Sequence, residues 1–403
     1  MKKIFISISS LLIILLAGAG WYFSGLIYEG GLNPEFTETN EIGTAEDRIV
    51  VASIDENTIT LNVEEELWGV MLEKGVYGVR GQNGDAVVGN IISSENNIVK
   101  RELINLSGTL VSGDKVSGTN LVTIDGTGSY KIMGTSSWSG QASEGVYTPE
   151  SVSNLAYETI SYTSDLGEFP SYLTTEGDKG IVIFIHGFRG NYSREVFALM
   201  RSGDLHDLGY RSMIISYRND SGLPKDPTGI YQYGTTEWKD VDGAINEALK
   251  YTDNVILWGT SGGGGPASSW LENVGDNNKI SGIIYEAPVI SFWESVEVNG
   301  AARFPWVPTQ LFSYFKIVTE LRYGVDFSAM DFREAVIESD IPVLLFHGDD
   351  DEWVPVAMSD YIASMRTENL TYVRYENVGH VTSWNADPIR YVKELSIFLN
   401  SLD

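Results

Sequence analysis

The chain has 403 residues, of which 43% are hydrophobic, 27 are lysine or arginine and 55 are aspartate or glutamate. This length and hydrophobic content predict two packed domains plus a tail and exclude a disordered chain. The formal net charge of −28 repels phosphate backbones, so we expect no nucleic-acid partner, and the absence of cysteine excludes disulfides, thiolate metal ligands and a cysteine nucleophile.

The N-terminus has the pattern of a membrane segment. Lys2 and Lys3 precede an uncharged stretch over residues 4–27, and Glu29 is the first acidic residue. As a helix this stretch would span about 36 Å, which is enough to cross a hydrocarbon core of about 30 Å. Because basic residues stay on the cytoplasmic side, we expect residues 1–28 to anchor the chain in a membrane, with everything after Glu29 outside the cytoplasm.

A cleaved signal peptide is the alternative for the same segment. The apolar core Ile4–Leu16 and the small residues Ala17-Gly18-Ala19 fit it, and the chain would then be secreted. The apolar stretch continues past Ala19 through Ile27, which favours the uncleaved anchor. The polar residues 29–44 that follow, with proline and glycines, predict a linker.

Residues 45–150 predict a small all-β domain. Short β-rich stretches such as Thr58–Val63 and Leu121–Ile124 alternate with turns such as Gln82-Asn-Gly-Asp. The segment contains no histidine and no motif with a known chemistry. We therefore expect a spacer or a docking platform there, and its protein partner is unknown.

From residue 151 the pattern changes to strands separated by helices. A hairpin is expected around Asp165-Leu-Gly-Glu, between Tyr157–Thr163 and Pro170–Thr174. Six more strands follow at Ile181–Ile185, Met213–Tyr217, Val255–Trp258, Gly282–Tyr285, Val343–Phe346 and Thr371–Tyr375, with helical stretches that include Glu237–Tyr251, Val356–Met365 and Pro388–Asn400. Residues 151–403 therefore predict an α/β domain with an eight-stranded, mostly parallel sheet covered on both faces.

The strongest motif is Gly259-Thr-Ser261-Gly-Gly263, which fits G-x-S-x-G between an apolar strand and a helix. Glycines at the two outer positions permit the sharp turn that raises a nucleophilic serine above a sheet. A phosphate-binding loop is excluded because the lysine of G-x-x-x-x-G-K-[ST] is missing. Ser261 is thus the expected nucleophile.

A serine nucleophile needs a base, and the chain has four histidines, His186, His206, His347 and His380. His380 follows the last strand, on the loop before the final helix, and is the expected base. The acid that orients it is expected in Asp349-Asp350-Asp351, where the residue pattern leaves the choice among three aspartates open.

A serine hydrolase also needs donors for the oxyanion of its tetrahedral intermediate. The turn that begins at His186-Gly187, after the strand Ile181–Ile185, can offer one backbone N–H, and Gly262 can offer another. His186 itself is expected to be a structural hydrogen-bonding residue beneath this site.

The order Ser261, aspartate, His380, with His-Gly after an apolar strand, resembles the α/β-hydrolase superfamily over roughly Tyr157 to Asp403. In that superfamily the loop after the seventh strand commonly reads H-G-x-x-D-x-x-V-P, which matches His347, Gly348, Asp351, Val354 and Pro355. The resemblance therefore implies that Asp351 is the acid. It also implies that Phe188, the residue after His-Gly, donates its N–H to the oxyanion.

Three further stretches resemble a bacterial membrane-anchored subgroup of these hydrolases with unsettled substrates: Ser216–Asp220, Glu237–Asp240 and Ser383–Pro388. An aromatic insertion over about residues 289–339 is expected to cap the site, which suits an acyl chain or a lipid-like ester. We expect a carboxylesterase or lipase-like enzyme without metal or organic cofactor. A peptidase or other amide hydrolase of the same fold, or a catalytically inactive surface-binding protein, are the alternatives.

Overall fold

The computed structural model describes residues 2–33, 49–63, 70–124, 129–133, 147–188 and 196–402. Among them, six strands form a closed antiparallel barrel in the order β1-β2-β5-β4-β3-β6, which we call the barrel. The strands are β1 (Ile49–Ile54), β2 (Thr58–Val63), β3 (Tyr77–Gly81), β4 (Gly84–Glu95), β5 (Ile98–Gly108) and β6 (Lys115–Thr119), with a short turn η2 (Val70–Leu72) before β3.

The barrel has a core of its own. Side chains of β2 alternate between buried and half-buried positions, as expected for a strand with one face toward a core. Fully buried residues from several strands meet inside, among them Ile59, Leu61, Val79, Val99 and Val116. A hairpin of β7 (Val122–Ile124) and β8 (Tyr130–Ile132) follows. The expected small all-β domain is therefore confirmed.

Residues 147–188 and 196–402 form what we call the sheet domain. Its eight strands lie in the order β16-β15-β14-β13-β11-β12-β10-β9, and only β10 runs antiparallel to its neighbours, β9 and β12. They are β9 (Tyr157–Ser164), β10 (Gly167–Thr174), β11 (Ile181–Ile185), β12 (Arg211–Ile215), β13 (Val255–Thr260), β14 (Gly282–Glu286), β15 (Val343–Gly348) and β16 (Leu370–Tyr375). The eight-stranded, mostly parallel sheet expected from the sequence is present.

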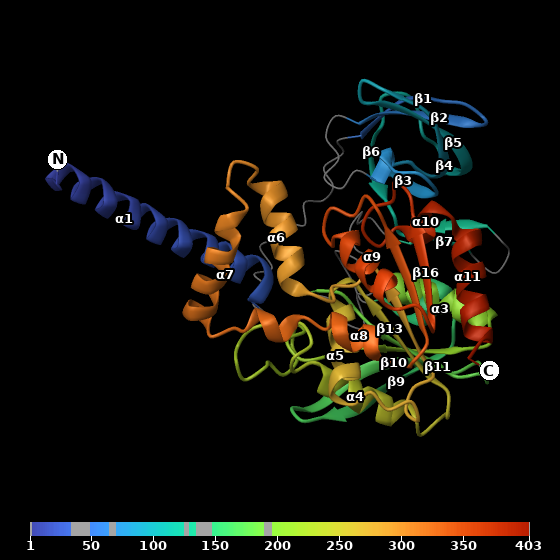
Figure 1. Ribbon diagram of the computed structural model, residues 1–403. Helices are drawn as coiled ribbons and strands as arrows, with labels where there is room; N and C mark the ends of the chain where they lie inside the picture. The colour runs from blue at the N-terminus through green and yellow to red at the C-terminus, as the bar shows by residue number, and fades with distance from the viewer. Residues whose placement is uncertain are drawn as a thin grey trace.

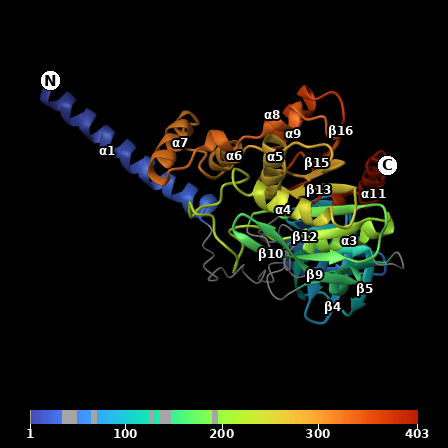
Figure 2. The same cartoon turned by 90° about the horizontal axis from the view of Figure 1, so that it is seen from below.

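Helices cover both faces of this sheet (Figures 1 and 2). One apolar core gathers residues of α3 (Val196–Asp207), α10 (Ser383–Ala386) and α11 (Pro388–Asn400), and the short α2 (Pro149–Ser153) packs on α3. The other core gathers residues of α4 (Trp238–Ala248), α5 (Gly264–Asn273), α8 (Arg333–Glu338) and α9 (Val356–Met365). The central strands are buried throughout because they contact helices on both sides.

The expected cap insertion is helical. After β14 it contains α6 (Phe292–Arg303), α7 (Gln310–Tyr323), a 3₁₀ turn η4 (Phe327–Met330) and α8. Helix α7 packs against α1 (Lys2–Ile27), whose N-terminal half projects away from the molecule (Figure 1).

Within the part of the chain that the structure describes, no helix is both long and apolar enough to cross a membrane. The expected transmembrane helix is therefore not confirmed. Most of the expected linker, residues 34–44, lies outside the described residues. Its first part continues α1 as a π-helical turn, η1 (Tyr28–Leu32), and Leu32 is fully buried against the sheet domain.

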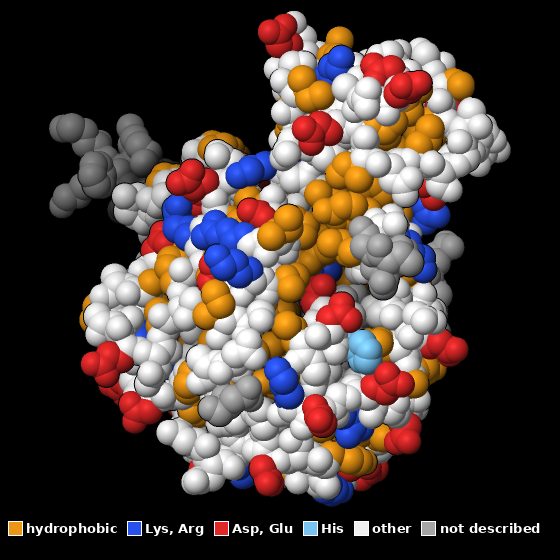
Figure 3. All heavy atoms as spheres, turned by 90° about the vertical axis from the view of Figure 1, so that its right-hand side faces the viewer, with side chains coloured by type: hydrophobic (Ala, Val, Ile, Leu, Met, Phe, Trp, Pro, Cys, Tyr) orange, Lys and Arg blue, Asp and Glu red, His pale blue; other side chains and the backbone are white. Residues whose placement is uncertain are grey.

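The barrel sits over the α10 end of the sheet domain (Figure 1). Figure 3 shows the two units as separate lobes with a narrowing between them, along which hydrophobic side chains gather.

Candidate active site

Ser261 directly follows β13 and begins the turn η3 (Ser261–Gly263) that leads into α5. Its backbone φ is +50°, a left-handed conformation that residues other than glycine seldom adopt. The turn is tight, since a Cβ on Gly263 would lie 2.0 Å from the carbonyl oxygen of Ile185 in the neighbouring strand. Only glycine fits there, and the serine is held at the carboxyl edge of the sheet.

His380 reaches the same edge from the loop between β16 and α10. Its Nε2 lies 2.9 Å from Oγ of Ser261, and its Nδ1 lies 2.7 Å from Oδ2 of Asp351. The imidazole is 7% exposed and the carboxylate is fully buried. The structure thus brings together three residues that lie far apart in the sequence, at the ends of β13, β15 and β16.

The Asp351 carboxylate is held on all sides. Its Oδ1 accepts the backbone N–H groups of Trp353 and Val354, both at 2.8 Å, and Nε2 of His347 lies 3.3 Å from Oδ2. Burial alone would raise the pKa of Asp351, but the charge of His380 and the hydrogen bond with His347 hold that pKa well below its usual range. The group is therefore ionised at neutral pH, as an acid that orients an imidazole requires.

The two neighbouring aspartates have other contacts. Asp349 accepts hydrogen bonds from Nη1 of Arg374 at 2.8 Å and from the backbone N–H of Asn377 at 2.6 Å. Asp350 is exposed, and its backbone N–H donates to Val378. Of the three aspartates, the structure places Asp351 alone against His380.

The two expected oxyanion donors lie side by side next to the serine. Phe188 follows β11, and a Cβ on Gly262 would lie 2.8 Å from the backbone nitrogen of Phe188. A Cβ on Gly187 would lie 3.2 Å from Cβ of Ser261. Two backbone amides next to one serine hydroxyl can stabilise the negative charge of a tetrahedral intermediate, provided both point at it.

His186 lies in the layer below and does not contact Ser261. Its Nε2 lies 2.9 Å from Oδ2 of Asp220, and its ring stacks on Tyr217 with centroids 4.2 Å apart. Asp220 also accepts the backbone N–H of Tyr217, and burial raises the pKa of its carboxyl group. This arrangement fixes the turn that carries Phe188, which agrees with the structural role expected for His186.

A network of buried charges lies beside this layer, and the sequence pattern did not reveal it. Arg218, 1% exposed, donates from its backbone N–H at 2.9 Å and from Nε at 2.7 Å to the fully buried Asp240. It also forms ion pairs with Asp165 and with Asp226. Arg218 and Asp240 come from two of the stretches that resemble the membrane-anchored subgroup, but the sequence does not show that the two residues form an ion pair.

An aromatic wall separates the serine turn from the cap. Phe188 stacks on Tyr233 at 5.7 Å, and Tyr233 stacks on Phe292 of α6 at 4.0 Å. The Tyr233 hydroxyl donates to the carbonyl oxygen of Gly31, and the backbone N–H of Tyr231 donates to Leu32. The turn η1 thus lies against the same aromatic wall.

Among the described residues, no group of three or more histidine, aspartate or glutamate side chains could hold a metal ion.

No protein-family model and no curated protein matches the sequence. The structure is similar to a solved esterase, Pf2001 of Pyrococcus furiosus: two crystal forms have TM-scores of 0.50 with 20% and 18% identity. In both, the match covers 64% of this chain, and it covers 95% and 94% of the esterase. Since almost the whole esterase is matched, the sheet domain has the α/β-hydrolase fold.

Proposed function

We propose that this protein is a serine hydrolase that cleaves carboxylic esters through a covalent acyl-enzyme. The observation that carries the proposal is the continuous chain of contacts from Ser261 Oγ to His380 Nε2 at 2.9 Å and from His380 Nδ1 to Asp351 at 2.7 Å. A hydroxyl, a base and an orienting acid in this order are the parts that nucleophilic acyl transfer needs. The fold, shared with an esterase, agrees with this assignment.

The mechanism follows from the geometry. His380 takes the proton from Ser261 while Oγ attacks the ester carbonyl carbon, and the backbone N–H groups of Phe188 and Gly262 stabilise the oxyanion. The imidazolium, paired with ionised Asp351, then protonates the leaving alcohol as the C–O bond breaks. Water, deprotonated by His380, attacks the acyl-enzyme and releases the carboxylic acid, which restores the serine. One oxyanion donor contributes roughly 3–4 kcal/mol to such a step.

A lipid-like ester is the substrate class that the surroundings favour. The wall beside the serine is built from aromatic rings, and behind it lies an apolar cluster that includes Leu32, Val289, Phe292 and Val354. The backbone N–H of Val289 donates to the carbonyl oxygen of Ser261, so this cluster begins directly at the nucleophile. An acyl chain gains free energy by leaving water for such a surface.

We further propose that residues 1–28 anchor the protein in a membrane with the sheet domain on the extracytoplasmic side. Support comes from Lys2 and Lys3 before the uncharged stretch, and from the cap, whose α7 packs on α1. Ring stacking joins α7 to α1 and to η1: the ring centroid of Phe23 in α1 lies 4.4 Å from that of Phe315, and the centroid of Tyr28 in η1 lies 4.2 Å from that of Tyr323. The cap would then lie next to the lipid phase from which a substrate enters.

The test is hydrolysis of p-nitrophenyl esters of increasing acyl length by full-length protein, beside aminoacyl-anilides. We expect ester turnover and labelling of Ser261 by a fluorophosphonate probe, and we expect Ser261→Ala to lose both while it keeps the melting temperature. Ser268→Ala is the control, because Ser268 is a buried serine of α5 that bonds Tyr285 and lies outside the site. Turnover by Ser261→Ala within about tenfold of wild type would refute the assignment.

A fractionation experiment tests the anchor. The full-length protein should remain with membranes after alkaline extraction and be cleaved by external protease. A soluble form that begins near Gly20 would show a cleaved signal peptide instead.

A further inference from the structure

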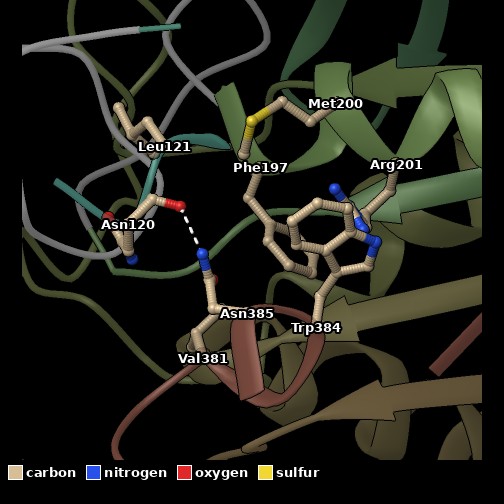
Figure 4. A pocket seen from close by; sticks show the side chains of 8 residues that line it. All are labelled: Asn120, Leu121, Phe197, Met200, Arg201, Val381, Trp384 and Asn385. Carbon is tan, nitrogen blue, oxygen red and sulfur yellow. Dashed lines mark hydrogen bonds between the residues drawn. The ribbon is translucent and has the colours of Figure 1, made fainter. Parts of the chain in front are cut away.

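The barrel contacts the sheet domain at α10, the four-residue helix that follows His380 in the chain. The backbone N–H of Val76 donates to the carbonyl oxygen of Asn385 at 2.8 Å. In return, Nδ2 of Asn385 donates to the carbonyl oxygens of Val76 and Asn120, both at 2.9 Å. Figure 4 shows the bond to Asn120. Asn385 is 4% exposed, so these bonds are made away from solvent and fix the orientation of the two units.

A glutamate of the barrel, Glu73, extends this contact to the loop that carries His380, which we call the histidine loop. Glu73 lies between η2 and β3, and its Oε2 accepts the hydroxyl of Thr382 at 2.9 Å and the hydroxyl of Tyr77 at 2.7 Å. The backbone N–H of Gly379 also donates to this carboxylate. Glu73 therefore holds the residue directly before His380 and the second residue after it.

The pKa of the Glu73 carboxyl group reflects both its burial and these hydrogen bonds. Burial raises its pKa, and the hydrogen bonds from Tyr77, Thr382 and Gly379 act in the opposite direction. A Cβ on Gly379 would lie 2.6 Å from Oε1 of Glu73, so the loop backbone touches the carboxylate without an intervening side chain.

The segment that carries Glu73 is itself fixed from inside the barrel. Arg101 of β5 is fully buried, and its guanidinium donates to the carbonyl oxygens of Met71, Glu73 and Gly75 at 2.7–2.9 Å. Its Nε donates to the carbonyl oxygen of Gly89 at 2.9 Å. A buried cation that binds three carbonyls of one short loop is a costly arrangement, and it leaves Glu73 little freedom to move.

The histidine loop needs such support because it is strained. Val381, the residue after His380, has a backbone φ of +56°, which a β-branched residue adopts only where its surroundings enforce it. Figure 4 shows the hollow beside Val381, where Leu121 and Asn120 face Trp384 and Asn385 across the boundary between the two units. Trp384 is held in turn by the guanidinium of Arg201, 4.0 Å above its ring.

We infer that the barrel is part of the catalytic apparatus and that Glu73 is its positioning residue, which holds the loop of His380 so that the imidazole faces Ser261. The inference rests on the proposed function, because a base must be positioned only if it acts as one. It gives the all-β domain a role other than that of a spacer: a spacer would need no buried, directional bonds to both sides of one histidine.

The test compares three barrel variants of the full-length protein. Glu73→Ala should lower kcat by between about tenfold and 100-fold with KM within about twofold, as expected when a catalytic group is misplaced by up to about 1 Å. Glu73→Gln keeps an oxygen for the N–H of Gly379, and its amide NH₂ can donate to the two hydroxyls, which then act as acceptors. This variant should recover most of the loss. Glu102→Ala is the matched control, since this exposed glutamate of β5 accepts a backbone N–H within the barrel and touches nothing in the sheet domain.

A second readout does not depend on turnover. The proton between His380 Nδ1 and Asp351 should give a far-downfield NMR resonance, because the hydrogen bond is short and charge-assisted. We expect this resonance in wild type and Glu102→Ala, and we expect it broadened or lost in Glu73→Ala. If Glu73→Ala does not fold, Thr382→Val removes the hydroxyl from the other side of the contact and should produce the same change to a smaller degree.

The outcomes separate this inference from the proposed function. If Ser261→Ala abolishes turnover but Glu73→Ala matches Glu102→Ala in kcat and in the resonance, the inference is wrong and the proposed function stands. The inference would also be wrong if Glu73→Ala and Glu73→Gln lowered kcat equally and each loss of kcat matched the fall in melting temperature. If Ser261→Ala remains active, the proposed function is wrong, and the resonance alone decides whether Glu73 positions His380.

Discussion

Two parts of the N-terminal half of the chain contact the sheet domain, and they use different forces. The barrel contacts α10 and the His380 loop through buried hydrogen bonds made by Asn385 and Glu73. Helix α1 and η1 contact the cap through stacked rings such as Phe23 on Phe315, and through the buried side chain of Leu32.

The difference matters because the two kinds of contact constrain geometry differently. A hydrogen bond weakens steeply when its angle changes, whereas apolar burial depends on area and has no preferred direction. The barrel side is therefore suited to fix the orientation of a catalytic loop. The α1 side is suited to cover and shape an apolar site that tolerates several ligands. The following experiments test whether the barrel contacts and the α1 contacts affect catalysis differently.

The largest effect is expected at Asp351, the carboxylate that bonds the imidazole of His380. Asp351→Asn should lower turnover by about 10⁴-fold, because the imidazole loses its orientation and its charge partner. Asp350→Asn is the control and should stay within roughly 0.5 kcal/mol in stability and near wild type in rate, as an exposed position permits. Asp349→Asn should lower the stability more than Asp350→Asn does, since Asp349 accepts hydrogen bonds from Arg374 and from the backbone of Asn377. A wild-type rate in Asp351→Asn would place the acid elsewhere.

The next effect tests the barrel side. Asn385→Ala removes both side-chain hydrogen bonds to the barrel. The buried carbonyl oxygen of Val76 loses a donor, at a cost of roughly 1–3 kcal/mol in unfolding free energy, whereas the carbonyl oxygen of Asn120 keeps the backbone N–H of Val122. We expect kcat to fall by about tenfold for short and long esters alike, because His380 is displaced for every substrate. Urea unfolding and kinetics on two acyl lengths measure this. Asn400→Ala, an exposed asparagine near the C-terminus, should change neither quantity.

The residues differ in how far the sequence could predict them. Ser261 and His380 could be found because one stands in a turn motif and the other is one of four histidines. Six of the eight strands could be found because each is an apolar stretch bounded by turns, and the other two because they flank the turn Asp165-Leu-Gly-Glu. Asp351 could be chosen over its two neighbours only through the family resemblance, since three adjacent aspartates are chemically alike and only folding decides which one faces the imidazole.

The contacts of the barrel could not be predicted. Glu73 and Thr382 are 309 positions apart, and no motif marks either residue. Barrel closure depends on strand pairing such as β1 with β6, which turn patterns do not specify. The stretch Ser383–Pro388 carries part of the family resemblance, but its role in binding the barrel follows only from the fold.

An effect of a different kind is expected on the α1 side. Leu32→Ala creates a cavity in the apolar cluster that includes Val289. The backbone N–H of Val289 donates to the carbonyl oxygen of Ser261. We expect the ratio of kcat/KM for long over short acyl esters to rise by roughly tenfold, the order expected when a pocket changes by about one methylene. The acetyl ester should keep its kcat. Leu26→Ala, on the exposed side of α1, should leave the ratio unchanged. An equal loss for all esters would show that this side also sets the catalytic geometry.

The smallest effect concerns Glu286, a fully buried acid behind the His380 loop that the mechanism does not use. It ends β14, its Oε2 accepts the hydroxyl of Tyr391 at 2.8 Å, and burial raises its pKa. Because the pKa is higher in the folded than in the unfolded state, folding takes up a proton. The stabilisation from this group is complete below the unfolded pKa of about 4.5 and is lost as pH rises through the folded pKa. Glu286→Gln cannot ionise, so its melting temperature relative to wild type should be higher at pH 8 than at pH 4, while kcat stays near wild type. A difference that does not change with pH would mean that Glu286 is not desolvated, and a large loss of kcat would mean that the support of the His380 loop extends from the barrel into the sheet itself.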